Sequence, residues 1–270
     1  MDAGFKFLSR FNSDGLRRHA GSAEPLGAHC VADFEGEGMA CKLARELCRA
    51  DRLPAKEFFE AVEVFARVRK KLRAPVVADL CCGHGLTGLL FALFERRVER
   101  VFLIDRAMPP NHASILEAVV RVGPWVREKV EVCETTIRGA KGFLEAGTSI
   151  VAVHACGQKT DQVLDLALHL GGAVAVMPCC YSRRQSPGSP ALSRALGVGV
   201  AYDVYRTCRL EAEGYAVRWE QVPPEITPMH RIVMGVPGSA TPSRAPSGGQ
   251  ESGQLLVGVK DVAVLILTEE

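Results

Sequence analysis

An acidic residue and two closely spaced glycines occur in the stretch DLCCGHG, from Asp79 to Gly85. Asp79 lies in the short aliphatic run PVVADL, which predicts a strand that leads into a glycine turn. Gly83 and Gly85 let the backbone turn tightly and approach a ligand, and Asp79 can fix the turn or accept hydrogen bonds. A second acid, Asp105, ends the next predicted strand, where a carboxylate can bind both hydroxyls of a ribose. The spacing therefore predicts a nucleoside-binding turn.

Aliphatic runs alternate with helical segments from residue 74 onward. Five predicted strands occupy residues 75–80, 100–105, 129–134, 149–155 and 172–178. Such βα units with short connections predict a parallel, doubly wound sheet. Ligands of these sheets bind beyond the carboxyl ends of the strands, next to the first strand. The glycine turn lies at that place.

The rest of the chain divides by composition. Residues 1–74 contain no good strand candidate and predict an N-terminal helical cap, whose clearest apolar face is formed by Phe58, Val62, Phe65, Val68 and Leu72. The main domain is predicted over 75–237. Residues 238–253 are rich in Ser, Gly and Pro and predict a flexible loop. The apolar run within 254–270 predicts a C-terminal edge strand.

Charge and cysteine content limit the partners and the compartment. The formal charge of +2 excludes a strong overall attraction to nucleic acid or acidic lipid. No uninterrupted apolar run reaches the roughly 18 residues of a membrane span. The first residues lack the apolar stretch of a secretory signal, so we expect a cytoplasmic protein whose ten cysteines are reduced and no membrane partner.

The pattern D-x-x-x-G-x-G from Asp79 to Gly85 resembles motif I of the class I S-adenosylmethionine-dependent methyltransferases. The resemblance implies an α/β, Rossmann-like fold with a seven-stranded, mostly parallel sheet in the order 3-2-1-4-5-7-6. In that family the turn approaches the methionine moiety, the acid of the second strand holds the ribose, and residues after the third strand flank adenine. Carried over, the residues that bind S-adenosyl-L-methionine are Asp79, Cys81, Gly83, Gly85, Asp105, Glu134 or Thr135, and His154.

Two further motifs narrow the resemblance. VHACGQKTD and MPCCYS are similar to a pair of motifs in a subgroup that includes tRNA 2′-O-methyltransferases with an N-terminal zinc finger. No cysteine and histidine array with zinc-finger spacing precedes the domain here, so specificity for tRNA does not follow. The resemblance implies methyl transfer to RNA or protein, and a small acceptor is not excluded. The candidate catalytic residues are His154, which could orient or deprotonate an acceptor, and Tyr181.

Cysteines gather at the ends of neighbouring strands. In the implied order the first, fourth and fifth strands lie side by side, so we expect the following side chains to converge: Cys81, Cys82, His154, Cys156, Cys179 and Cys180. The main interpretation is a pocket lined by small polarizable groups, with no metal. A zinc site formed by Cys81, Cys156, Cys179 and Cys180 is a minor alternative, and a redox pair is a third.

Two other functions compete with methyl transfer. A protein that binds S-adenosylmethionine without turnover would serve as a scaffold. An NAD-linked oxidoreductase would need a glycine near the position of Cys81, because the turn must approach a pyrophosphate. The type of ligand that stabilises the protein separates these alternatives.

Overall fold

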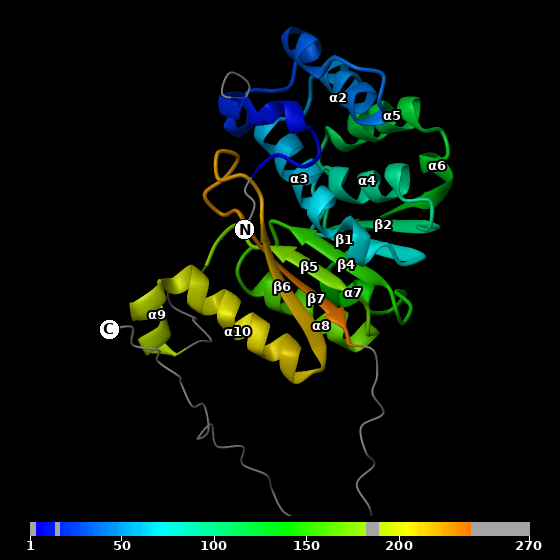
Figure 1. Cartoon of the computed structure of the whole chain (residues 1–270). Helices are drawn as coiled ribbons and strands as arrows, with labels where there is room; N and C mark the ends of the chain where they lie inside the picture. The colour runs from blue at the N-terminus through cyan, green and yellow to red at the C-terminus, as the bar shows by residue number, and fades with distance from the viewer. Residues whose placement is uncertain (1–3, 14–16, 182–188, 239–270) are drawn as a thin grey trace, which may run out of the picture. The chain divides into compact units, whose positions relative to one another are not determined.

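One mixed sheet of seven strands organises the computed structural model, in the order β3-β2-β1-β4-β5-β7-β6 (Figure 1). The structure describes residues 4–13, 17–181 and 189–238. The strands are β1 (Val76–Leu80), β2 (Arg100–Asp105), β3 (Val130–Glu134), β4 (Ser149–Val153), β5 (Val174–Met177), β6 (Tyr215–Gln221) and β7 (Arg231–Pro237). The first five strands are parallel, and β7 is antiparallel to both β5 and β6. The predicted class and strand order are confirmed.

Helices connect the strands and precede them. The α-helices are α2 (Met39–Ala50), α3 (Ala55–Leu72), α4 (Leu86–Phe94), α5 (His112–Val122), α6 (Val126–Lys129), α7 (Ile137–Ala140), α8 (Gln158–Leu170), α9 (Pro190–Leu196) and α10 (Val198–Ala212). Three short 3-10 helices occur near the N-terminus: η1 (Ser9–Asn12), η2 (Arg18–Gly21) and η3 (Ala28–Phe34). None of the helices in the described ranges is long and apolar enough to span a membrane. The loop predicted over 238–253 and the strand predicted within 254–270 lie outside these ranges, except for Gly238.

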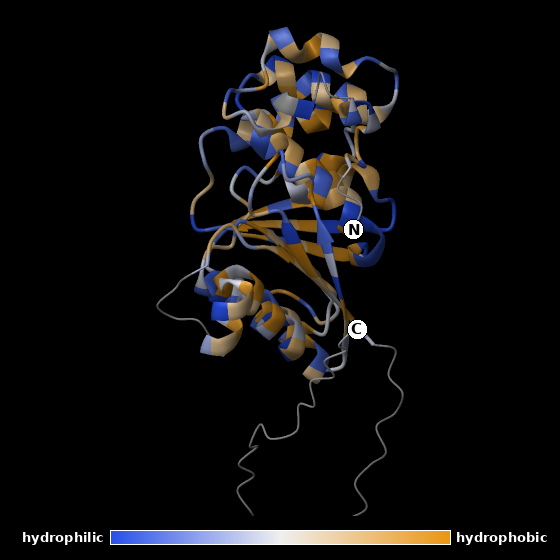
Figure 2. Ribbon diagram, turned by 60° about the vertical axis from the view of Figure 1, so that its left-hand side comes forward, coloured by the Kyte–Doolittle hydropathy of each residue, from blue (hydrophilic) through white to orange (hydrophobic). Residues whose placement is uncertain are grey.

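The strand residues alternate between two apolar layers, one on each face of the sheet. Val77 of β1 packs with α3 and α4, whereas its neighbour Ala78 packs with α8. Figure 1 shows α3, α4 and α5 over one face and α7, α8 and α10 over the other. Figure 2 shows the hydrophobic strands enclosed between helices whose outer sides are hydrophilic. Both faces are covered because a parallel sheet buries both of its sides.

Helix α3 packs directly on the sheet. Pro54 immediately precedes its first turn, and Phe58, Val62 and Phe65 are fully buried. The ring centroids of Phe65 and Phe91 of α4 lie 5.1 Å apart in an edge-to-face arrangement. The helix also contacts β4, β5 and β7. The N-terminal part of the chain therefore reaches the carboxyl edge of the sheet, where the glycine turn lies.

Gly88 allows α4 to lie close to the sheet. A Cβ atom at this position would come within 2.4 Å of Leu103 Cδ2 and 3.0 Å of Asp79 Cβ. A larger residue would push the first turn of α4 away from β1 and β2. This glycine thus fixes where the helix starts relative to the end of β1.

A buried ion pair attaches the N-terminal segment to α3. The side chains of Glu63 and Arg67 are paired and have no exposed surface. Glu63 Oε1 accepts the N–H of Phe7 at 2.9 Å, and Glu63 Oε2 accepts the N–H of Lys6 at 3.0 Å. Arg67 also donates to the carbonyl of Gly4 at 2.7 Å. The Glu63 carboxylate therefore pairs with the Arg67 guanidinium and also accepts hydrogen bonds from the backbone of residues that are far away in the sequence.

Replacing Glu63 should destabilise the fold strongly. In Glu63→Ala the Arg67 guanidinium stays buried without its counter-charge, and we expect a loss of about 3–5 kcal/mol in the free energy of unfolding. Urea denaturation measures this change. The control is Glu211→Ala, at an exposed position of α10, which should change stability by less than about 0.5 kcal/mol. Similar losses in the two variants would contradict a central role for the pair.

Candidate functional site

Two carboxylates fix the turn after β1. Asp79 Oδ2 accepts the N–H of Gly88 at 2.8 Å, and Asp105 Oδ2 accepts the N–H of Gly83 at 2.9 Å. Asp105 Oδ1 accepts a further bond from the N–H of Arg106 at 2.7 Å. Asp79 is 1% exposed, and burial raises the pKa of its carboxyl to about 7. The acids that the sequence analysis singled out thus hold the turn as well as facing the site.

The turn backbone is left-handed at three positions. The φ angles of Cys81, Gly83 and Gly85 are 55°, 53° and 83°. Glycine adopts such angles without steric cost, whereas they are uncommon for cysteine. Cys81 therefore takes the conformation of a turn glycine while it presents a side chain to the site. Burial raises the pKa of its thiol, which favours the neutral form.

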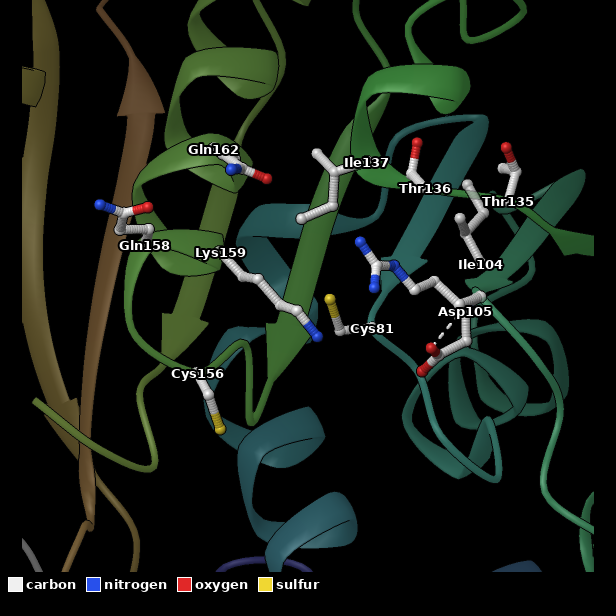
Figure 3. Close-up of a pocket in the computed structure, with 11 residues that line it drawn as sticks. Cys81, Ile104, Asp105, Thr135, Thr136, Ile137, Cys156, Gln158, Lys159 and Gln162 are labelled. Atoms are coloured by element: carbon white, nitrogen blue, oxygen red, sulfur yellow. Dashed lines mark hydrogen bonds between the residues drawn. The ribbon is translucent and has the colours of Figure 1, made fainter.

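The first cavity, here called the strand-end pocket, has a volume of about 340 Å³. Its walls come from the carboxyl ends of three strands and the turn: Asp105 ends β2, Thr135 and Ile137 follow β3, Lys159 follows β4, and Cys81 belongs to the turn. Figure 3 shows the Lys159 side chain extending toward Cys81, with the Asp105 carboxylate on the other side of that cysteine. A carboxylate at one end and an apolar side chain at the other suit a ligand with both a sugar and a ring.

The second cavity, here called the α3 pocket, has a volume of about 210 Å³ and shares Cys81 with the first. Asp79 and Gly83 line it from the turn, and His154 lines it from the end of β4. Glu57 and Glu60 line it from α3. The two pockets share Cys81 and lie at the carboxyl edge of β1, β2 and β4, where a doubly wound sheet binds its ligands.

The α3 pocket contains two pairs of a glutamate and a histidine. Glu60 Oε2 lies 2.7 Å from His154 Nε2, and Glu57 Oε2 lies 3.2 Å from His84 Nε2. The hydrogen bond with His84 lowers the pKa of Glu57. Both glutamates come from a helix outside the βα repeat, and the sequence analysis did not identify them. The available signal was the recurrence of Glu57, Glu60 and Glu63 at every third residue among the apolar residues of the first half of α3.

Two other candidate residues, Glu134 and Tyr181, do not line either pocket. Glu134 Oε1 accepts the N–H of Met108 at 2.8 Å and so holds the loop after β2, while Thr135 next to it lines the strand-end pocket. The hydroxyl of Tyr181 donates to Asp203 Oδ2 at 2.8 Å, and Arg231 Nε donates to the same oxygen at 2.9 Å. Burial raises the pKa of Tyr181, so its hydroxyl remains a neutral donor. These contacts hold Tyr181 within a polar network.

That network also contains Asp161. Its Oδ1 accepts from Arg206 Nε at 2.9 Å, and the Arg206 side chain is completely buried. Arg206 lies over the rings of Tyr181 and Tyr202, at 5.7 and 5.2 Å from their centroids. The network joins α8, α10 and β7 to the segment after β5. These contacts hold the segment after β5 in place.

Three of the strand-end cysteines gather. The sulfur atoms of Cys156, Cys179 and Cys180 all lie within 4.8 Å of one another, and Cys156 is bonded to Cys179 as a disulfide. The expectation of reduced thiols is therefore wrong for this pair. Three of the four cysteines of the minor zinc alternative thus lie together, and Cys81 lies outside this group. Cys179 does approach His154, whose carbonyl lies 3.7 Å from its Sγ.

A comparison with protein families matches residues 55–186, just under half of the chain, to a methyltransferase domain. A stretch of 119 residues is 28% identical to a glutathione S-transferase C-terminal domain-containing protein of Xenopus laevis and covers 44% of this chain. The chain spans only 18% of that relative's length.

Solved structures with a similar arrangement of elements include three methyltransferases or proteins described as such. An O-methyltransferase family protein from Burkholderia thailandensis is 16% identical, with a TM-score of 0.43 over 78% of this chain and 63% of that chain. A putative rRNA-methylase from Clostridium thermocellum is 13% identical, with a TM-score of 0.45 over 64% and 94%. The magnesium protoporphyrin IX methyltransferase from Synechocystis is 12% identical, with a TM-score of 0.39 over 84% and 96%.

The buried carboxyl of Asp79 should make stability depend on pH. Folding raises its pKa from an ordinary value of 3.8 to about 7, so between these values the folded protein holds a proton that the unfolded chain has released. Stability contributed by this group therefore falls as the pH rises from about 4 to about 7. In Asp79→Asn the amide oxygen can still accept the N–H of Gly88, but this dependence disappears. The free energy of unfolding of the wild type minus that of the variant should decrease over this range, and a constant difference would contradict the assignment.

Proposed function

We propose that this protein transfers a methyl group from S-adenosylmethionine to an RNA or protein acceptor, because residues 55–186 match a methyltransferase domain and the turn after β1 resembles the motif of methyltransferases that use this donor. One observation carries the proposal: the strand-end pocket and the α3 pocket meet at Cys81. The first pocket offers a carboxylate and an apolar wall for a nucleoside. The second offers a histidine beside the turn, where the reacting group would lie.

The residues present fit the donor. The oxygens of Asp105 each accept one backbone N–H and keep lone pairs for ribose hydroxyls. Ile137 supplies an apolar surface for adenine at the other end of the pocket. A Cβ atom at Gly83 would meet no atom within 4 Å, so the space that a side chain would fill there is open to the methionine moiety. No phosphate needs to approach the position occupied by Cys81.

The protein's own task is to align the acceptor. When bound, S-adenosylmethionine supplies a methyl group that is already activated by its sulfonium, so rate enhancement depends largely on in-line placement of the acceptor. His154 orients or deprotonates the acceptor in the α3 pocket. Tyr181 acts from a distance, through the network with Asp203 that holds the segment after β5. No step requires a metal.

Ligand binding tests the site directly. S-adenosylhomocysteine at about 100 times its dissociation constant should stabilise the wild type by roughly 2.7 kcal/mol, whereas NAD should not. Gly83→Val should abolish this stabilisation, because the added side chain enters the pocket. Gly147→Val is the matched control. Gly147 lies in an exposed turn before β4, its φ is 82°, and an added Cβ atom would meet no atom within 4 Å, so valine causes similar backbone strain there without entering the pocket. Stabilisation of Gly83→Val equal to that of the wild type, or stabilisation by NAD alone, would contradict the proposed site.

Transfer of a labelled methyl group tests the activity and the acceptor. The protein is incubated with S-[methyl-³H]adenosylmethionine and a cell extract, and each product is divided for nuclease or protease treatment. Loss of macromolecular label after nuclease identifies RNA, and loss after protease identifies protein. Binding of the donor with no label in any fraction would contradict the proposal and support a non-catalytic scaffold.

A further inference from the structure

Glu60 is a buried acid whose main partner is a histidine of the candidate site. Its side chain is 1% exposed, and its Oε2 lies 2.7 Å from His154 Nε2. Within the described ranges its Oε1 has no hydrogen-bond partner, although Lys56 Nζ lies 3.6 Å away. Placing a carboxylate here is costly without full compensation. The cost suggests a role beyond anchoring α3.

His154 is held at both its backbone and its ring. Its φ angle is 69°, a left-handed conformation that is uncommon for a residue with a side chain. Its N–H donates to the carbonyl of Met177 at the end of β5, at 3.1 Å. Strained residues of this kind cluster at functional sites. The backbone turns the ring toward α3, and Glu60 then fixes its orientation.

The two histidines of the α3 pocket differ in one respect. His84 contacts Glu57 through Nε2, and its Nδ1 accepts the N–H of Leu86 at 3.2 Å, so both ring nitrogens are engaged. His154 contacts Glu60 through Nε2, while its Nδ1 has no hydrogen-bond partner among the described residues. The His154 side chain is 39% exposed and lines the pocket. Of the two histidines, therefore, only His154 has a ring nitrogen with no hydrogen-bond partner among the described residues.

A carboxylate that accepts a hydrogen bond from one imidazole nitrogen fixes the tautomer. Ionised Glu60 can only accept, so neutral His154 carries its proton on Nε2 and has its lone pair on Nδ1. The same carboxylate stabilises the imidazolium that forms when Nδ1 takes up a proton. Carboxylate–histidine pairs activate hydroxyl nucleophiles on unrelated folds by this arrangement.

We propose that Glu60 is a positioning residue that fixes His154 as a base for an acceptor hydroxyl, an inference that rests on the proposed methyl transfer. The proton of the hydroxyl moves to Nδ1, the oxygen forms a bond to the methyl carbon, and the donor's sulfur–carbon bond breaks to leave a neutral thioether. A hydroxyl is the acceptor that needs such a base, because it is a weak nucleophile until it loses its proton. A neutral amine can attack with its own lone pair.

The tautomer can be measured on the free protein. Nitrogen-15 chemical shifts of the histidine side chains, recorded in alkaline buffer, distinguish a proton on Nε2 from one on Nδ1, and His154→Gln assigns the resonance by removing it. We expect the Nε2–H tautomer in the wild type. In Glu60→Gln the carboxamide can donate or accept, so both tautomers should be populated. Glu57→Gln, one helical turn away, removes the partner of His84 and should leave His154 in the Nε2–H tautomer.

Two results would overturn the inference. One is the Nδ1–H tautomer of His154 in the wild type. The other is an unchanged rate of label transfer in Glu60→Gln, where we expect a loss of about 100-fold with unaltered affinity for S-adenosylhomocysteine. Failure of the wild type to bind S-adenosylhomocysteine or to transfer label would instead refute the proposed function. The tautomer of His154 can still be determined in that case, because it is measured on the free protein.

Discussion

The hydrogen bonds from two acidic side chains to the backbone after β1 determine the geometry of the whole site. Asp79 binds the N–H of Gly88 in the first turn of α4, and Asp105 binds the N–H of Gly83 in the turn itself. Because Asp79 is the last residue but one of β1 and Asp105 is the last residue of its neighbour β2, these bonds couple the position of the turn to the register of the sheet. The left-handed backbone at Cys81, and the two pockets that meet there, follow from that coupling.

Helix α3 links the N-terminal part of the chain to this edge of the sheet. Its aromatic side chains pack against α4 and bury the helix deeply, which places Glu60 and Glu63 where water is largely excluded. Glu63 uses that position to hold residues 6 and 7, while Glu57 and Glu60 face the α3 pocket. The same packing therefore stabilises the fold and supplies the acids that orient the site's histidines.

The sequence predicts the fold well because hydrophobic periodicity and glycine spacing are local signals. The strand from Val76 and the turn at Gly83 are recognisable from adjacent residues alone, and the strand order follows from the family resemblance. The glutamate–histidine pairs are different, because Glu60 and His154 are far apart in the chain and meet only when α3 packs on β4. Their sequence signal, a glutamate at every third position, is also typical of a solvent-exposed face.

The sequence likewise could not predict the roles of residues whose hydrogen-bond partners come from distant parts of the chain. Tyr181 follows a motif at a strand end, yet its hydroxyl is engaged by Asp203 from a helix and Arg231 from another strand. Glu134 ends β3 as expected for a residue near adenine, but it bonds to the backbone of Met108. Cys156 and Cys179 follow different strands, and their disulfide depends on the neighbouring positions of β4 and β5.

In the proposed site, the donor lies across both pockets at the carboxyl edge of the sheet. A crystal structure of the protein with S-adenosylhomocysteine tests it most directly. We expect the ribose hydroxyls to bind Asp105, the adenine to pack against Ile137, and the sulfur to lie beside Cys81 on the side that faces His154. A nucleoside bound elsewhere, or a sulfur directed away from the α3 pocket, would contradict it.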